Sequence, residues 1–174
     1  GDAHEYFPSV LAEEDGVILA GFEALESAAR TGAVSLRSFK RLLSSPTVTP
    51  QSLVRIGDTE TTIQDALVIY LSALRAAIEK SSNVRTLLRD DALRAVVAVP
   101  AHAHSAQRFM TLEAFRAAGF QVVGMIHEPS AAGFEYTHRQ GRTLNSRRTR
   151  VLVYDLGGGT FDASLVSVDG GRHL

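Results

Sequence analysis

The 174-residue sequence has no cysteine and no tryptophan, and it contains only 5 prolines. The absence of cysteine excludes disulfide bonds, a thiol nucleophile and thiolate ligands to a metal. No apolar run reaches the roughly 18–20 residues that a membrane-spanning helix needs, and no signal-peptide pattern opens the chain. These absences lead us to expect a cytoplasmic protein with no membrane partner.

The sequence also lacks an excess of charge of either sign, since 18 Lys and Arg face 19 Asp and Glu, a net charge of −1. We therefore expect no nucleic-acid partner, and we interpret the arginine-rich stretch 138–150 as a solvated surface loop. The composition, 45% hydrophobic and 21% charged, is typical of a globular domain. The chain begins with Gly and ends just after a glycine-rich turn at 169–171, so we expect a piece of a longer protein.

Hydrophobic periodicity and turn residues predict helices that alternate with strands. The expected helices are 22–30, 35–43, 62–80, 105–118 and 128–136. The expected strands lie within 7–20, 52–62, 95–99, 120–126, 150–155 and 160–169. Because the later strands are apolar on both faces, this order indicates an α/β fold whose sheet is covered on both faces.

Local signals predict where three of these helices begin or end. Thr61 and Gln64 have the spacing of a capping box before the helix at 62–80. Ser105 is the expected N-cap of the next helix, and Gly119 its C′ residue. Pro129 is expected in the first helical position of the last one.

The most specific local pattern is DLGGGTFD at residues 155–162. Three successive glycines let backbone N–H groups approach an anion closely, and the flanking Asp155 and Asp162 suit a hydrated Mg²⁺. The Thr160 hydroxyl could then bind a phosphate or a water. A plain hairpin turn with incidental acids explains the pattern equally well, and both interpretations stay open. The pattern is neither a Walker A loop nor a dinucleotide-binding fingerprint.

Two other charged residues have alternative interpretations. Lys40, on a short amphipathic helix, is either a solvated surface charge or a group that stabilises a transferred phosphoryl group. Glu128, just before Pro129, is either a helix-start acid or a catalytic residue. We expect no zinc site at His102 and His104, because no acidic partner stands at ligand spacing.

Seven segments, taken in order, resemble the ATPase domain of heat shock protein 70 chaperones. They are FPSV (7–10), SFKRLL (38–43), AVVAVPA (95–101), SAQR (105–108), AAGFQV (117–122), EPSAAGFEY (128–136) and VYDLGGGTFD (153–162). The resemblance implies the actin-like ATPase (ribonuclease H-like) fold. Residues 1–174 would be a partial nucleotide-binding domain, in which 1–90 form the outer and 91–149 the inner subdomain of the first lobe. Residues 150–174 would open the second lobe with a hairpin.

The resemblance also implies a cofactor and a set of site residues. The cofactor would be ATP or ADP with Mg²⁺, and with K⁺ as a further ion. The catalytic residues would be Lys40 at the γ-phosphate together with Glu128, Asp155 and Thr160. The phosphate-binding residues would be Gly157, Gly158, Gly159 and Thr160, the metal ligands Asp155 and Asp162, and the allosteric relay Pro100 and Arg108.

The partners implied by the resemblance are unfolded polypeptide clients, held by a domain outside this chain, a J-domain co-chaperone and a nucleotide exchange factor. Several residues depart from the family pattern where co-chaperone coupling is expected. His102 and His104 stand where an aromatic residue and asparagine are usual, and Ser105 replaces aspartate. Gly124 replaces a basic residue, and His127 replaces asparagine. Because the family's first phosphate hairpin and most of its second lobe are absent, we expect this piece alone to bind ATP weakly or not at all.

Two alternatives to a chaperone remain at this point. The first is a regulatory or scaffold actin-like ATPase without a peptide-binding domain, which the departures at Ser105 and Gly124 keep open. The second is a small-molecule kinase of the same fold superfamily, against which the SFKRLL and EPSAA segments argue.

Overall fold

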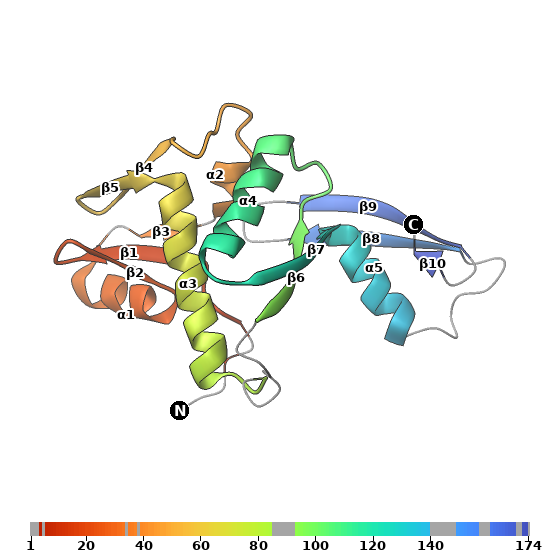
Figure 1. The fold of residues 1–174 in the computed structure, drawn as a ribbon, viewed down its shortest axis with the longest axis horizontal. Coiled ribbons are helices and arrows are strands. Elements are labelled where there is room, and N and C mark those ends of the chain that lie inside the picture. Colours follow the sequence, from red (N-terminus) through yellow and green to blue (C-terminus); the bar gives the residue numbers. More distant parts are fainter. Residues whose placement is uncertain are drawn as a thin grey trace. The chain divides into compact units, whose positions relative to one another are not determined.

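The computed structural model describes residues 4, 6–33, 35–37, 39–84, 93–139, 149–156, 161–169 and 172–173. They divide between two compact units, unit 1 with residues 1–95 and 104–123, and unit 2 with residues 96–103 and 124–174 (Figure 1). The elements lying wholly in unit 1 are β1 (Val10–Glu14), β2 (Val17–Ala20), α1 (Phe22–Thr31), β3 (Leu36–Arg37), α2 (Phe39–Leu43), β4 (Leu53–Ile56), β5 (Thr59–Thr62), α3 (Ile63–Ser81) and α4 (Ser105–Ala117). Those lying wholly in unit 2 are α5 (Glu128–Arg139), β8 (Arg150–Leu156), β9 (Phe161–Asp169) and β10 (Arg172–His173). The paired strands β6 (Arg94–Val99) and β7 (Gln121–His127) each begin in unit 1 and end in unit 2.

Two antiparallel hairpins, β1–β2 and β4–β5, confirm the strands predicted in the first third of the chain. The short strand β3 adds to the free edge of β1, where Leu36 pairs with Leu11. The predicted helix over 35–43 is therefore too long, since Leu36–Arg37 form this strand and the helix α2 covers only Phe39–Leu43. The helical pattern of residues 35–43 is overridden at Leu36–Arg37 by backbone pairing with β1, which is distant in the sequence.

Glu13, near the end of β1, joins the turns of the two hairpins. Its carboxylate accepts hydrogen bonds from the backbone N–H of Gly16, at 2.6 Å, and of Asp58, at 3.2 Å. These two bonds stabilise the ionised form, so they hold the pKa of Glu13 below its ordinary value, with Gly16 contributing most. A side chain at Gly57 would collide with Glu13, because a Cβ there would lie 2.5 Å from its Oε2 atom.

The helix α3 begins one residue later than the sequence predicts. Thr62 is the N-cap, and its Oγ1 atom accepts a hydrogen bond from the backbone N–H of Asp65 at 3.0 Å. The predicted capping box of Thr61 and Gln64 is therefore wrong. Gln64 instead donates from its side-chain amide to the carbonyl of Met110 on α4, 3.4 Å away.

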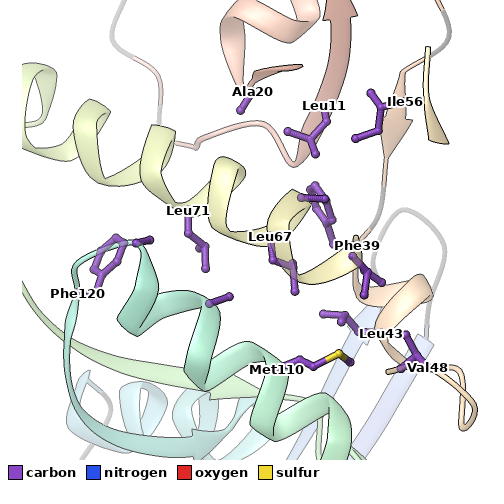
Figure 2. Close-up of a cluster of buried hydrophobic side chains, with 14 of the residues drawn as sticks. Leu11, Ala20, Phe39, Leu43, Val48, Ile56, Leu67, Leu71, Met110 and Phe120 are labelled. Carbon is purple, nitrogen blue, oxygen red and sulfur yellow. The ribbon is translucent and has the colours of Figure 1, made fainter. Parts of the chain in front are cut away.

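The core of unit 1 lies between α3, α4 and the two hairpins. Figure 2 shows Leu67 and Leu71 directed from α3 toward α4, where Met110 and Phe120 complete the contact, while Leu11 lies on the opposite side of α3. Met110 and Leu11 are fully buried. The apolar stripe of α3 therefore packs in the core, and it fixes α4 against α3.

The ends of α4 agree only in part with the prediction. Gly119 does follow the C-cap residue Ala118 in the left-handed conformation, with φ +86°. The N-cap, however, is His104 rather than Ser105, because Ser105 is already the first helical residue and His104 has extended backbone angles. The Nδ1 atom of His104 accepts the hydrogen bond of the Gln107 backbone N–H.

Unit 2 is built on the antiparallel β8–β9 hairpin, with β10 paired to β9 and α5 packed on the hairpin (Figure 1). The contact is close at Gly133 of α5, where a Cβ would lie 3.1 Å from the Cγ1 atom of Val166. Burial on β6 alternates, since Val97 and Val99 are buried while Val96 is 63% exposed. One face of this strand is therefore exposed among the described residues, and cover on both faces of the sheet stays a prediction.

The described strands form small separate sheets, with orders β2–β1–β3, β10–β9–β8, β4–β5 and β6–β7. Mixed helix and strand content confirms the α/β class in its coarse form.

α5 starts at Glu128, so Pro129 is its second residue, and it continues to Arg139. Among the residues with a described placement, no helix is both long and apolar enough to cross a bilayer.

Candidate functional site

A pocket of about 230 Å³ lies within unit 2, where α5 begins beside the β8–β9 hairpin. Its walls come from the turn after β6, the start of α5 and the two hairpin strands. The lining residues are Ala101, Glu128, Pro129, Ala132, Val153, Tyr154, Asp155, Asp162 and Ser164.

Asp155 and Asp162 are directly paired across the β8–β9 hairpin. Side chains in such a pair share one face of the sheet, with Cβ atoms about 4.5–5.5 Å apart, and two like charges there destabilise the pairing. Both carboxylates line the pocket, and Asp155 is exposed. A cation between the two carboxylates would offset their repulsion, which makes this face of the hairpin a candidate for binding a metal ion.

Val153 pairs with Ser164, two residues along each strand from the paired aspartates. Because side chains alternate along a strand, these two side chains lie on the same face as Asp155 and Asp162. They also line the pocket, Val153 with an apolar and Ser164 with a hydroxyl side chain. Sequence reasoning missed Ser164. The signal that could have found it is the two-residue spacing from Asp162.

Glu128 brings a third carboxylate to the same pocket. It is the first residue of α5 and directly follows the end of β7, so the strand-to-helix junction sets its position. The close contact between Gly133 and Val166 holds this helix against the hairpin. The structure thus brings Glu128 into the same pocket as Asp155 and Asp162, which the sequence analysis had treated as a separate motif.

The donor set of the pocket fits a hydrated ion better than a closed metal cage. Within the described ranges, no group of three or more His, Cys, Asp or Glu side chains is arranged to hold a metal. Mg²⁺ commonly keeps several waters and takes only one or two protein carboxylates, the rest coming from phosphate oxygens. Two opposed aspartates meet that requirement.

The other predicted site residues lie elsewhere or outside the described residues. Lys40 is on α2 and Arg108 on α4, both in unit 1. Pro100 belongs to unit 2, and its carbonyl accepts a hydrogen bond from the backbone N–H of Ala103 at 3.0 Å. Gly157, Gly158, Gly159 and Thr160 lie outside the described residues, as does most of the arginine-rich stretch, from 140 to 148.

His127, the residue before Glu128, is a feature that the sequence indicated only as a departure from a family pattern. Its Nδ1 atom is buried and has no hydrogen-bond partner within the described part of the chain. The end of β7 therefore carries an unsatisfied polar atom next to a pocket-lining carboxylate.

Comparison with known proteins finds relatives for most of the chain. The family model for Hsp70 protein matches residues 55–173. Chaperone protein DnaK of Halobacterium salinarum is 34% identical over 159 residues, covering 91% of this chain and 23% of that protein. Chaperone protein DnaK of Thermosipho africanus is 33% identical over 165 residues, covering 94% and 25%. That of Mycoplasmoides gallisepticum is 34% identical over 168 residues, covering 94% and 26%. The chain thus spans about a quarter of the length of these curated relatives.

Proposed function

Because the chain belongs to the Hsp70 protein family, we propose that it forms part of the nucleotide-binding domain of a chaperone ATPase. The observation that carries the proposal is the pairing of Asp155 with Asp162 in a pocket that also contains Glu128. Membership of the family implies the actin-like ATPase fold, and the mixed helix and strand content with small sheets is consistent with it.

In this proposal the pocket binds the phosphates of ATP or ADP with Mg²⁺. Asp155 and Asp162 hold the hydrated ion, which when bound neutralises charge on the phosphate oxygens. Glu128 orients water and a further ion such as K⁺ at the mouth of the pocket. Positioning and charge stabilisation are the main catalytic demands of phosphoryl transfer, and carboxylates on a rigid hairpin and helix suit the positioning.

Other roles in the proposal rest on the family resemblance of single residues. Lys40 contacts the γ-phosphate, and Thr160 with the three glycines at 157–159 binds the phosphate chain. Pro100 and Arg108 relay the nucleotide state. The division into an outer subdomain at 1–90, an inner subdomain at 91–149 and the start of a second lobe at 150–174 also stays a prediction.

The activity of the whole protein is a proposal as well, since this chain spans about a quarter of its relatives' length. We propose that ATP hydrolysis controls the binding of unfolded polypeptides by a part of the protein outside this chain. A J-domain co-chaperone and a nucleotide exchange factor would act on the cycle. The similarity to chaperones does not favour the alternative of a scaffold ATPase.

The test is Mg²⁺-dependent ATP hydrolysis by a protein of the relatives' length that contains this chain. Asp155→Asn and Asp162→Asn should each lower the rate at least about tenfold and raise the Mg²⁺ concentration needed. Glu60→Gln, at an exposed position on β5, is the matched control and should leave the rate unchanged. Equal rates in all four proteins would contradict the proposal.

A second pair of variants tests the basic residue. Lys40→Ala should lower the rate of hydrolysis, because it removes the charge proposed to stabilise the γ-phosphate. Arg41→Ala removes the neighbouring exposed charge of α2 and should not. If both variants lose the rate equally, the role proposed for Lys40 is wrong, and general charge on α2 explains the effect.

A further inference from the structure

His104 links two segments of unit 1 by hydrogen bonds at both of its ring nitrogens. Its Nδ1 atom accepts from the backbone N–H of Gln107, 3.2 Å away, in the first turn of α4. Its Nε2 atom lies 3.1 Å from the backbone carbonyl oxygen of Ser45, which is 59 residues earlier in the chain. The ring is therefore both the N-cap of α4 and a tie to the turn that follows α2.

The two contacts together require one protonation state of the ring. A backbone N–H can only donate, so Nδ1 must carry a lone pair to accept from Gln107. A carbonyl oxygen can only accept, so Nε2 must carry the proton that it donates to Ser45. Both bonds exist at once only in the neutral imidazole with its proton on Nε2.

The tie leads to the end of the helix that carries Lys40. The backbone N–H of Ser44 bonds to the carbonyl of Lys40 at 3.1 Å, and that of Ser45 bonds to Leu42 at 3.3 Å. The same Ser45 carbonyl that faces His104 also accepts from the backbone N–H of Val48 at 3.2 Å. Holding this carbonyl therefore holds the last turn of α2 and the turn after it.

A proton on Nδ1 would remove the cap of α4. Nδ1 would become a donor facing the donor N–H of Gln107, and a positive charge would stand at the positive end of the helix dipole. The ring would keep its donor for Ser45 but lose its fixed orientation.

The elements around His104 carry several cationic groups. Lys40 and Arg41 on α2 are cationic, and so is Arg108, one turn further along α4. The first turn of α4 has no acidic residue. The charged groups further off are His102, two residues earlier, Glu113, which pairs with Arg116 on α4 at 2.9 Å, and Asp65 on the adjacent α3, which accepts a hydrogen bond from Thr62 at 2.7 Å.

We propose that His104 is a proton-sensitive positioning residue, which when neutral caps the N-terminus of α4 while it is bonded to the turn after α2, and which loses the cap when protonated. The link between the two helices stands on the hydrogen bonds alone. Only its consequence for Lys40 depends on the proposed function, because that function gives Lys40 its role at the γ-phosphate.

The first test is NMR spectroscopy of the whole 174-residue chain. At pH 7.5 the ring of His104 should show the tautomer with the proton on Nε2. When the ring is protonated at lower pH, protection of the Gln107 amide from hydrogen exchange, corrected for intrinsic rates, should fall about fivefold, which is the size of effect expected when a helix loses its N-cap. A proton on Nδ1 at pH 7.5, or unchanged protection, would overturn the proposal without any variant being made.

Variants at two histidines separate the cap from other effects of pH. His104→Asn keeps an N-cap oxygen that does not titrate, so Gln107 should stay protected at both pH values. His104→Ala should lower protection at both. His102→Asn, at an exposed position two residues earlier, should behave like the unaltered chain. Loss of the pH effect in His102→Asn, or its persistence in His104→Asn, would refute the assignment.

The consequence for Lys40 needs the longer protein and the pH profile of ATP hydrolysis. His104→Asn should remove part of the fall in rate between pH 7.5 and 5.5, while His102→Asn should not. If Lys40→Ala leaves hydrolysis unchanged, the proposed function of Lys40 fails, yet the ring tautomer and the Gln107 exchange still decide whether the link exists. An unaltered pH profile in His104→Asn, with Lys40 active, would show that the link does not position Lys40.

Discussion

The carboxylate of Glu13 accepts a hydrogen bond from the backbone N–H of Asp58, 3.2 Å away and 45 residues later in the chain. The same carboxylate accepts from the backbone N–H of Gly16 at 2.6 Å. One ionised side chain on the surface of unit 1 thus satisfies backbone donors from the turns of both hairpins. Because it does so only when ionised, the link depends on pH.

The pH dependence of unfolding should report this link. The pKa of Glu13 in the folded chain lies below its ordinary value of 4.5, first because of Gly16 and then because of Asp58. The link therefore contributes stability above the unfolded pKa, and this contribution is lost as pH falls through the folded value. Thermal unfolding from pH 7 to 3 should show a smaller loss of Tm for Glu13→Gln than for the unaltered chain. Glu60→Gln, an exposed control on β5, should keep the full loss; an identical curve for Glu13→Gln would refute the link.

Alanine substitutions at Gly57 and Gly16 test whether the Glu13 side chain leaves room for a Cβ atom at residue 57. Both have positive φ, but a Cβ at Gly57 would lie 2.8 Å from the Cβ of Glu13, whereas one at Gly16 meets nothing within 4 Å. Gly16→Ala should lower the free energy of unfolding by about 1–2 kcal/mol, from backbone strain alone. Gly57→Ala should lower it by more, because the side chain of Glu13 must also move. Urea unfolding measures the free energy of unfolding of both variants. Equal losses would show that the Glu13 side chain moves away from residue 57 without an energetic cost.

The N-cap of α3 provides a test of one-residue precision. Thr62→Ala should lower the free energy of unfolding by about 0.5–2 kcal/mol, because the N–H of Asp65 loses its acceptor. Thr61→Ala, one residue earlier on β5, should change it by no more than about 0.5 kcal/mol. If urea unfolding shows a larger loss of stability for Thr61→Ala than for Thr62→Ala, Thr61 is the N-cap and the assignment of Thr62 is wrong.

The contact of Gly133 with Val166 should resist a larger side chain. Gly133→Val should lower the free energy of unfolding by about 1–3 kcal/mol, since the new methyl groups meet the Val166 side chain in a packed site. The same substitution in a Val166→Ala background should cost less, because the smaller side chain leaves room. A cost that is the same in both backgrounds would mean that the strain arises elsewhere on α5.

The paired aspartates should repel each other when no cation is present. In low salt with a chelator, Asp155→Asn should raise the free energy of unfolding by about 0.2–1 kcal/mol, and added NaCl should shrink this gain. Added Mg²⁺ should stabilise the unaltered chain more than the variant. Calorimetric melts with and without Mg²⁺ make the comparison. If the variant is less stable in the chelator, the two carboxylates are already compensated by other groups.

Features set by local sequence were predictable to a large extent. The β1–β2 and β4–β5 hairpins follow from turn residues between short strand-like segments, and α3 follows from its apolar residues at 3.6-residue spacing. The opposition of Asp155 and Asp162 follows from their short separation in the sequence, once β8 and β9 pair in register. These features need only neighbours in the sequence to be specified.

Features that depend on distant partners were not predictable in the same way. Leu36 becomes a strand residue because Leu11 offers a free backbone edge, which a propensity for helix cannot reveal. Residue type favours Ser105 as the N-cap of α4. The structure uses His104 instead, whose ring also contacts the carbonyl of Ser45, far away in the sequence. Ala101 joins the pocket of Glu128 through the tertiary fold alone.

The division of the chain into two units has a consequence for how it folds during synthesis. Unit 1 is made of two segments of the chain, 1–95 and 104–123, and the segment 96–103 between them belongs to unit 2. Unit 1 therefore lacks α4 and its core side chain Met110 until the ribosome has also made the first segment of unit 2. No single cut can separate the units, and a ribosome that stalls before residue 104 holds a nascent chain whose α3 stripe has no α4 to cover it.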